Sequence, residues 1–467
     1  MKMWSGRFRQ PLDPEFERWQ RSFDFDRRLL AHELAASSAH ARALKGAGIL
    51  NSTELIAILQ GLEQIGEQAA ASAAFLEDEE AEDVHHFIEK QLVALIGDTG
   101  YKLHSGRSRN EQIATDLRLY VRTAIDQIHA DLAACCGALL DQAQQAGNAA
   151  MPAYTHLQRA EPVLVSHWML AYVEMFLRDA DRLADCRKRL NVCPLGSGAV
   201  AGATLPLDRR AMASDLVFDG PTANSIDATS DRDFALEFVN TLSILALHLS
   251  RWAEEMILFS SQEFGFVHLP EAYSTGSSAM PQKKNPDLLE LTRAKCARVI
   301  GNATTLQICL KGLPLAYNKD LQETQEPLFE AADTVLSLLP LVTSWMKVVD
   351  FNYERMQQAA QSGFMNAWAA ATYLVQRGVP FRLAHERIGQ AVQICLEKHC
   401  ELQDLSLEEL RSVNRNFSED FYACLKLESV LAIHDVPGGT APDRVRQALS
   451  DARQRIESIR ETAHAHA

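Results

Sequence analysis

The sequence lacks an excess of positive charge. Lys and Arg number 46 against 61 Asp and Glu, which gives a formal net charge of −15 at pH 7. Proteins that bind nucleic acid usually carry a basic surface, and anionic membranes attract basic segments. The balance therefore argues against both partners. A small anionic substrate stays compatible with it, because such a ligand needs only a few local cations.

The sequence also lacks the patterns that hold metals, disulfides and nucleotides. Its nine cysteines have irregular spacing with no Cys-x-x-Cys pair, and no two histidines have zinc-protease spacing. No glycine-rich loop joins a strand to a helix in the manner of a nucleotide site. We therefore predict no zinc site, no disulfide framework and no nucleotide site, in a reducing compartment.

Long hydrophobic runs are missing as well. The N-terminal residues have no apolar core of signal-peptide length. The longest apolar stretch, Val335 to Met346, contains Pro340 and polar residues and is too short to cross a bilayer. These absences predict a cytoplasmic protein without a membrane partner.

The sequence does contain long helical patterns. Apolar residues recur at steps of three and four from 113 to 139 and from 234 to 259. Each pattern predicts one apolar stripe on a helix of about 25 to 30 residues, well above the globular mean. Clear strand alternation is scarce. With 467 residues, 47% of them hydrophobic, the chain is predicted to be mainly α, built from two or three units around a helical bundle.

Several segments interrupt the helices. Breaks are predicted at Gly97–Ser105, at Asn148–Thr155, at Cys193–Pro206, at Gly265–Pro286 and near Ser362. The fourth is a long polar loop, and long loops inside compact proteins are usually functional.

That long loop ends in a helix start. Asn285 is a good N-cap, Pro286 a favoured first helical residue and Asp287 suits the first turn. The free N–H groups of such a start, with Lys283 and Lys284 before them, can hold a carboxylate or its doubly charged deprotonated form. A capped surface loop with two solvated lysines is an equally good interpretation of these residues alone.

Two further segments are candidates. Ser108 and Glu111 predict a capping box, so that Arg109 and Asn110 crowd a helix N-terminus that can bind an anion. A well-capped helix with exposed arginines is the simpler alternative. His156, predicted at the start of a helical run, has a side chain suited to proton transfer, although a lone histidine is more often structural.

The remaining polar segments suggest structural roles first. Asn224–Ser225 and Ser230–Asp233 precede the helix over 234–259 and are predicted to cap that helix or form ion pairs. The run from Leu315 to Gln322, which includes Tyr317, can bind a ligand or join two helices. Glu290, one turn into the helix after the long loop, can orient His156 if the fold brings them together.

Taken together, these segments resemble the argininosuccinate lyase branch, which includes the delta-crystallins, of the fumarase/aspartase superfamily. The Gly-Ser-Ser-x-Met-Pro signature of the superfamily matches Gly276–Pro281, and the resemblance extends from Met3–Phe8 to Gly378–Arg382. The branch itself is indicated by the motifs at His104–Asn110, Tyr154–Arg159, Asp231–Phe234 and Leu315–Gln322.

The resemblance implies a three-domain fold, with an N-terminal helical domain over 1–106, a central long-helix domain over 107–361 and a C-terminal helical domain over 362–467. It implies a homotetramer whose active sites are shared between subunits. The implied reaction is β-elimination of argininosuccinate to arginine and fumarate, the last step of arginine synthesis, without metal or cofactor.

The resemblance also implies residue roles. Ser277 and His156 are the expected proton-transfer pair, with Ser277 taking the Cβ proton and Glu290 orienting His156. Lys283 and Asn285 are expected to stabilise the aci-carboxylate intermediate. The other expected substrate-binding residues are Ser22, Arg109, Asn110, Thr155, Tyr317, Gln322 and Gln325.

Three departures from the family pattern bear on the substrate. Gln325 stands where the family usually has a lysine that touches a substrate carboxylate, and Glu161 replaces a usual glutamine. Phe364–Trp368 replaces a stretch rich in serine and threonine. Two alternatives therefore stand beside the main interpretation: a lyase that releases fumarate from a different N-succinyl amine, and a non-catalytic structural relative such as the lens crystallins of this family.

Overall fold

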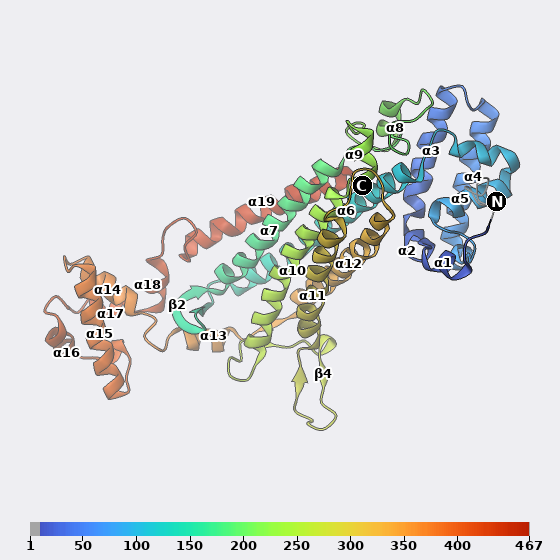
Figure 1. Cartoon of the computed structure of the whole chain (residues 1–467). Helices are drawn as coiled ribbons and strands as arrows, with labels where there is room; N and C mark the ends of the chain where they lie inside the picture. Colours follow the sequence, from blue (N-terminus) through green and yellow to red (C-terminus); the bar gives the residue numbers. More distant parts are fainter. Residues whose placement is uncertain (1–9, 467) are drawn as a thin grey trace. The chain divides into compact units, whose positions relative to one another are not determined.

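The computed structural model describes residues 10–466, with side chains through residue 461. The motif at Met3–Phe8 lies outside this part of the chain. The described residues form a mainly α fold, as predicted (Figure 1). No described helix is both long and apolar enough to cross a membrane.

The chain divides into two compact units. Unit 1 consists of Met1–Asp126, Arg182–Ser243 and Arg298–Thr334, and unit 2 of Gln127–Asp181, Ile244–Ala297 and Val335–Ala467. Five long helices each contribute residues to both units: α6 (Arg109–Ala146), α7 (Val165–Leu190), α10 (Asp233–Ser260), α11 (Asp287–Leu310) and α12 (Gln325–Val348). The helices predicted over 113–139 and 234–259 are therefore present as α6 and α10. The division into three sequence domains stays a prediction.

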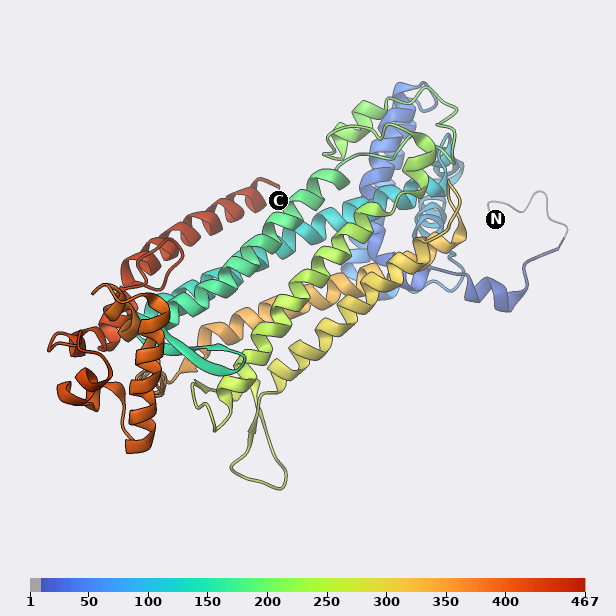
Figure 2. The ribbon, with the colours of Figure 1, turned by 60° about the vertical axis from the view of Figure 1, so that its left-hand side comes forward.

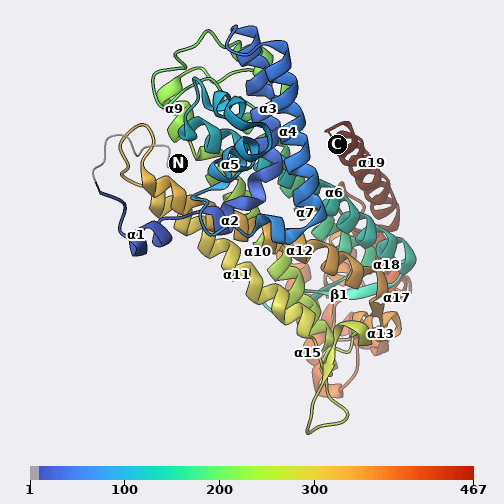
Figure 3. The same cartoon turned by 90° about the vertical axis from the view of Figure 1, so that its right-hand side faces the viewer.

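Unit 1 adds shorter helices to its share of the long ones. These are α1 (Pro14–Trp19), α2 (Phe23–Asp26), α3 (Leu30–Gly46), α4 (Ser52–Ala71), α5 (Val84–Ile96), α8 (Arg209–Asp215) and α9 (Ser225–Ser230). Helices α3, α4 and α5 lie side by side (Figure 3). Asn51 and Glu54 form a reciprocal capping box that starts α4. Asn224 caps the short helix α9 and not the long helix over 234–259 that it was expected to cap.

Unit 2 contains all the strands found in the described residues. They are β1 (Ala150–Thr155), β2 (Gln158–Leu164), β3 (Val267–His268), β4 (Thr275–Gly276), β5 (Lys284–Asn285) and β6 (Asp350–Phe351). They pair as three antiparallel two-stranded ribbons, β1 with β2, β3 with β6 and β4 with β5. The C-terminal helices are α13 (Tyr353–Ala360), α14 (Ala367–Val375), α15 (Phe381–Lys398), α16 (Leu407–Val413), α17 (Phe421–Cys424), α18 (Leu427–Ala432) and α19 (Pro442–His466).

The β1–β2 hairpin corrects two sequence predictions. Asn148–Thr155 was expected to be a loop, and His156 was expected at the start of a helix. Both lie in or next to a hairpin, with Thr155 opposite Gln158 and the helix beginning only at Val165. Pro152 obscured the strand in the sequence, because proline is rare inside sheets and tolerated only at edges and bulges. The register here does shift between Pro152 and Tyr154.

The core of unit 2 joins its long helices in pairs. Trp252 of α10 meets Trp345 of α12 edge to face at 5.2 Å between ring centroids. His129 of α6 lies 2.6 Å from the Ala180 carbonyl of α7, and His248 of α10 lies 2.6 Å from the Asp179 carboxylate of α7. These contacts hold the helices that carry the two hairpin loops described next.

Candidate active site

A loop between β4 and β5 presents Ser277 and Lys283. Gly276 pairs with Lys284, so Ser277 and Lys283 are the first residues beyond the paired ribbon on either side. Residues 277–283, here called the Ser277 loop, project beyond the ends of α10 and α11 (Figure 2). The ribbon places a hydroxyl and an ammonium at the mouth of one exposed loop.

The backbone of this loop surrounds the Ser277 oxygen with donors. The N–H groups of Ala279 and Met280 donate to Ser277 Oγ at 3.2 and 3.1 Å. Hydrogen bonds to the charged form of a group favour that form. Two N–H donors on Oγ, with Lys283 nearby in the loop, are therefore an arrangement that stabilises a serine alkoxide.

Asn285 does not cap α11, contrary to the prediction. The helix begins at Asp287, and the Glu290 N–H donates to the Pro286 carbonyl at 3.0 Å. The Asn285 side chain instead accepts from Lys283 Nζ at 2.6 Å and donates to Thr275 Oγ1 at 3.3 Å. Asn285 pairs with Thr275 in the β4–β5 ribbon, and α11 begins only at Asp287. Pro286, and not Asn285, therefore occupies the N-cap position. Asn285 consequently positions the Lys283 ammonium.

His156 lies at the tip of the β1–β2 hairpin. His156 and Leu157 form the two-residue turn and have φ angles of 54° and 56°. Both are positive, which defines the type I′ turn that matches strand twist in hairpins. Thr155, His156 and Leu157 are all exposed. The imidazole therefore projects from a short, conformationally fixed turn.

The described residues of unit 2 do not join these groups into one bonded set. No hydrogen bond links His156 to Ser277 or to Glu290, and both His156 and Glu290 are exposed. The structure brings together Ser277, Lys283 and Asn285. It places Thr155 beside His156.

The predicted binding residues Arg109 and Asn110 lie at the start of α6 in unit 1. Glu111 accepts from the Ser108 N–H at 3.0 Å, which is half of the predicted capping box, while Ser108 Oγ accepts from Asn110 rather than from Glu111. The Arg109 guanidinium forms an ion pair with Asp83. The Asn110 amide donates to the Ala199 carbonyl at 3.2 Å.

Arg107, in the same segment, is buried rather than exposed. Its guanidinium lies 3.3 Å from the Glu33 carboxylate and donates to Ser37 Oγ at 2.8 Å. Both nearby arginines are thus neutralised inside the chain. The alternative of a capped helix with exposed arginines therefore does not hold for Arg107, because nothing in the local sequence indicates its pairing with Glu33.

Ser22 is held by a buried carboxyl. Ser22 Oγ donates to Asp26 Oδ2 at 2.6 Å, and the Val84 N–H donates to Asp26 Oδ1 at 3.0 Å. Burial, together with the Asp83 charge, raises the pKa of Asp26 to about 7. Asp26 thus ties Ser22 to the start of α5.

The other predicted binding residues of unit 1 are Gln322, Tyr317 and Gln325. Gln322 is buried and donates to the Gln20 carbonyl at 3.1 Å. Burial raises the pKa of Tyr317. Gln325 is 3% exposed at the start of α12, and its Oε1 has no hydrogen-bond partner in the described chain. An unpaired buried acceptor is costly, so this position is suited to receive a donor.

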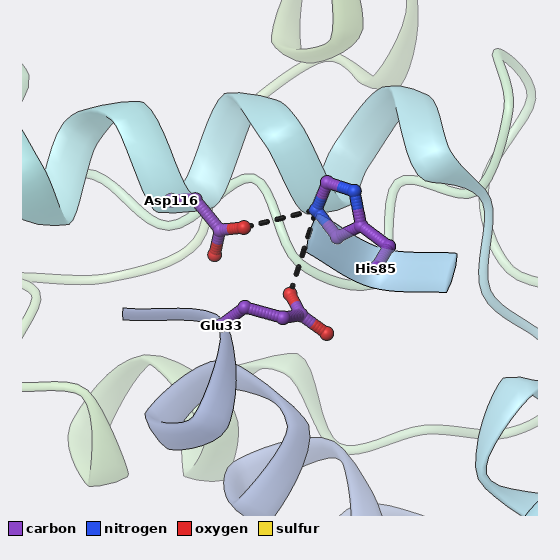
Figure 4. A group of neighbouring side chains, drawn as sticks. All are labelled: Glu33, His85 and Asp116. Carbon is purple, nitrogen blue, oxygen red and sulfur yellow. Dashed lines mark hydrogen bonds and ion pairs between the residues drawn. The ribbon is translucent and has the colours of Figure 1, made fainter. Parts of the chain in front are cut away.

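Glu33, His85 and Asp116 form a buried cluster, which Figure 4 shows. One possible ligand atom from each lies within 4.8 Å of the others, which makes the cluster a geometric candidate for a metal ion. His85 Nε2 lies 2.9 Å from Asp116 and 3.7 Å from Glu33. A metal ligand must offer a lone pair, so the protonation of His85 decides whether this cluster can hold a metal ion.

The chemistry of this cluster does not fit a metal. Burial lowers the pKa of His85, but the hydrogen bond to Asp116 and the negative charges of Glu33 and Asp83 outweigh it and raise the pKa to about 10. A protonated imidazole has no lone pair to give to a metal. Glu33 already has Arg107 as a cationic partner, and burial together with the Glu33 charge raises the pKa of Asp116 well above its ordinary value, which disfavours the carboxylate form that a metal needs. The cluster is a buried ion network that leads through Asp83 to Arg109.

Sequence reasoning missed this network. His85 lies in the run Glu82-Asp83-Val84-His85-His86, where the Asp before a helical stretch signals only an N-cap. Asp83 does cap α5 through the His86 N–H at 2.7 Å. The pairing of α3, α5 and α6 that joins Glu33, His85 and Asp116 is a tertiary fact that no local pattern carries.

Two family models match most of the chain. A family described as "Lyase" matches residues 6–301, and one described as "Argininosuccinate lyase C-terminal" matches residues 364–432. The chain is 58% identical to the argininosuccinate lyase of Koribacter versatilis over 467 residues, which is 100% of both chains. It is 58% identical to that of Acidobacterium capsulatum, with 98% of this chain and 96% of the relative covered.

Solved structures give the same result. EDDS lyase in complex with formate superimposes with a TM-score of 0.85 at 26% identity, covering 98% of this chain and 92% of that chain. An EDDS lyase variant with bound fumarate gives 0.84 at 25% identity, with 98% and 93% covered. The predicted fumarase/aspartase-type fold is confirmed, and the chain belongs to the argininosuccinate lyase family.

Proposed function

We propose that this protein catalyses the β-elimination of argininosuccinate to arginine and fumarate. The observation that carries the proposal is the full-length identity to argininosuccinate lyases together with an intact Ser277 loop, in which two N–H groups donate to Ser277 Oγ. The reaction breaks a C–N bond after a proton leaves the neighbouring carbon.

The difficult step is removal of a proton beside a carboxylate. The C–H is a poor acid, because its loss places a second negative charge on that carboxylate. Preorganised donors aimed at this charge lower the barrier, and losing one such donor typically costs roughly 10²–10³ in rate. Lys283, oriented by Asn285 at 2.6 Å, is the donor that we assign to the aci-carboxylate.

Ser277 takes the Cβ proton in this proposal, since the Ala279 and Met280 N–H groups stabilise its alkoxide. His156 gives a proton to the leaving guanidino nitrogen, and Glu290 orients His156. The reaction then needs no metal or organic cofactor. Ser22, Arg109, Asn110, Thr155, Asn285, Tyr317, Gln322 and Gln325 bind the substrate.

Assembly of the site from several chains is a further part of the proposal. Helix α11 buries a narrow stripe of residues at steps of three and four, namely Leu289, Thr292, Cys296, Val299, Ala303 and Leu306. A second stripe with the same spacing is exposed and contains one charged residue among small or apolar ones: Leu291, Ala294, Arg298, Gly301, Thr305 and Ile308. Such a heptad stripe is typical of a helix that packs against another helix. A homotetramer that pairs these stripes brings His156 of one chain to Ser277 of another.

Subunit mixing tests this assembly. His156→Ala and Ser277→Ala proteins are each expected to be nearly inactive. After joint unfolding and reassembly, roughly a quarter of the sites in a random closed tetramer receive both intact residues. Mixed oligomers that are confirmed by mass spectrometry and remain inactive contradict the shared site.

Substrate choice is tested by following fumarate absorbance with argininosuccinate, adenylosuccinate and other N-succinyl amines. The likeness to EDDS lyase, solved with bound fumarate, favours a second candidate, a lyase that releases fumarate from a different amine. Preference for argininosuccinate by at least about tenfold in kcat/KM supports the first proposal. Fumarate from another amine alone supports the second, and no fumarate at all supports a non-catalytic relative. We place the reaction in the cytoplasm.

A further inference from the structure

The turn that carries His156 has an unfavourable sequence for its conformation. Type I′ turns need positive φ at both central residues and are dominated by Asn-Gly, Asp-Gly and Gly-Gly. Here the two residues are His156 and Leu157, with φ angles of 54° and 56°. Positive φ is tolerated by histidine but is a genuine outlier for a bulky apolar residue. The strain therefore lies mainly at Leu157.

Leu157 is unfavourable in a second way. Its side chain is 69% exposed, so that the described chain covers little of its apolar surface. The backbone of the turn is held by the Thr155–Gln158 pair, and Arg159 beside it donates to the Ala359 carbonyl at 3.3 Å and to Ser362 Oγ at 3.0 Å. These bonds fix the hairpin, but none involves the leucine side chain. Strain of this kind persists where other interactions compensate for it.

We propose that the Leu157 side chain inserts into an apolar surface of a second copy of the chain, and that this contact holds the turn that presents His156. The proposal rests on the shared site described above. A second copy of the chain is the suitable partner for the Leu157 side chain, because α11 already presents an exposed stripe that includes Leu291 and Ile308, at 56% and 64% exposure. The substrate is an unsuitable partner for this side chain, since its charged groups lose hydration against a leucine. Leu157 is thus a positioning residue that acts through His156.

The chain contains a matched control residue in unit 1. Val217 is also apolar, has φ of 57° and is 75% exposed. It shares the strain and the exposure of Leu157 but belongs to no segment that carries a candidate catalytic residue. A difference between the two positions therefore reports the contact that we propose rather than the backbone conformation.

Accessibility tests the contact without reference to activity. Leu157→Cys and Val217→Cys proteins are alkylated with iodoacetamide in the native assembly and in denaturant, and labelling is followed by peptide mass spectrometry. We expect native Cys at position 157 to react at least roughly tenfold more slowly than in denaturant, as a group that must await local opening. The position 217 control should react at nearly its denatured rate. Equal native and denatured rates at position 157 overturn the proposal, even if the protein cleaves argininosuccinate.

A substitution series tests the positioning role. Leu157→Met keeps an apolar side chain with no better tolerance of positive φ, whereas Leu157→Asn has a similar size, favours positive φ and is polar. We expect the Met variant to stay within about threefold of the parent kcat, and the Asn variant to lose at least about tenfold in kcat with KM little changed, as small misplacements of catalytic groups do. The reverse order, or full activity in both variants, contradicts the proposal. Wild-type protein without lyase activity removes the proposed function instead, and the alkylation result then decides the contact alone.

Discussion

The ion network at Glu33, His85 and Asp116 and the two hairpin loops at His156 and Ser277 are opposites in construction. The network is buried, and His85 touches carboxylates on both ring nitrogens, at 2.9 Å to Asp116 and 3.8 Å to Asp83. The loops are largely exposed, and their side chains make few bonds. The binding residues expected in unit 1 are thus held by bonds within one chain. In the proposed assembly, the proton-transfer groups are completed only by substrate and by neighbouring subunits.

This difference follows from the chemistry. Binding residues gain from rigidity, because a preorganised site loses less entropy when the ligand arrives. A serine base and an imidazole acid gain from a closed, dry site, which a single open chain does not supply. The two regions should therefore respond differently to substitution, with rate affected in the loops and stability in the network.

The largest effect is expected in the Ser277 loop. Ser277→Ala should lower kcat by about 10²–10⁴, the usual range for a positioned acid or base, while substrate still binds. Steady-state kinetics measure kcat, and calorimetry with the inactive variant measures binding.

The neighbouring Ser278 offers a matched control in the same loop. Ser278→Ala should stay within about threefold of the parent rate, because a hydroxyl outside the reacting set contributes little to the barrier. If Ser277→Ala keeps more than about a tenth of the parent kcat, Ser277 does not act as the base.

A substitution in the buried network should change the free energy of unfolding. His85→Gln removes the cation beside Asp116 and leaves Glu33 with Arg107 alone, and breaking a buried pair typically costs about 3–5 kcal/mol in the free energy of unfolding. The pKa of His85 is raised from 6.5 to about 10, so its contribution is fully present below about pH 6.5 and is lost as pH rises through about 10. Chemical denaturation across this range should show the gap between wild type and variant closing with increasing pH.

An exposed histidine provides the contrast. His268 pairs with Asp350 at 2.8 Å on the surface, and exposed pairs contribute little. His268→Gln should leave the unfolding free energy almost unchanged at every pH. A gap for His85→Gln that does not depend on pH assigns the loss to packing instead of charge.

The same contrast marks how far the sequence could be used to predict the molecule. The long helices α6 and α10 were predictable, because an apolar stripe repeated over many turns has few alternatives. The motif residues Ser277 and Lys283 were predictable as a loop with anion-binding character. The hairpin at His156 was not, since Pro152 and a His-Leu turn both argue locally against strands. The pairing of Arg107 with Glu33 was not either, because residues 74 positions apart meet only through the packing of whole helices.

A moderate effect is expected at Gln325, where the family usually has lysine. Gln325→Lys adds a charge that can pair with a substrate carboxylate, and an ion pair worth about 1 kcal/mol lowers KM roughly fivefold with kcat little changed. Because the position is 3% exposed, the lysine should also lower the melting temperature of the unliganded protein. Gln325→Glu instead adds a negative charge, which repels a substrate carboxylate, and should raise KM. A lysine variant with unchanged or raised KM indicates that this pocket accepts a different substrate or is compensated elsewhere.

The smallest effect is expected from backbone strain at Val217, a position outside the candidate active site. Val217 follows α8 in a Schellman motif, in which the Val217 N–H donates to Ser214 and the Phe218 N–H donates to Ala213. Gly48 occupies the same position after α3, with φ of 77° and the equivalent bonds from Gly48 to Lys45 and from Ile49 to Leu44.

These two positions make a reciprocal test in unit 1. Val217→Gly relieves a left-handed conformation that costs a β-branched residue about 1–2 kcal/mol, less the entropy that glycine loses on folding, and should stabilise by about 0.5–1 kcal/mol. Gly48→Val should destabilise by a similar amount, because a Cβ there meets no atom within 4 Å and only the backbone conformation opposes it. Both free energies come from denaturant titration, and kcat should not change in either. Loss of stability in Val217→Gly means that the valine side chain is buried in the assembly, and position 217 is then an interface like the one that we propose for Leu157.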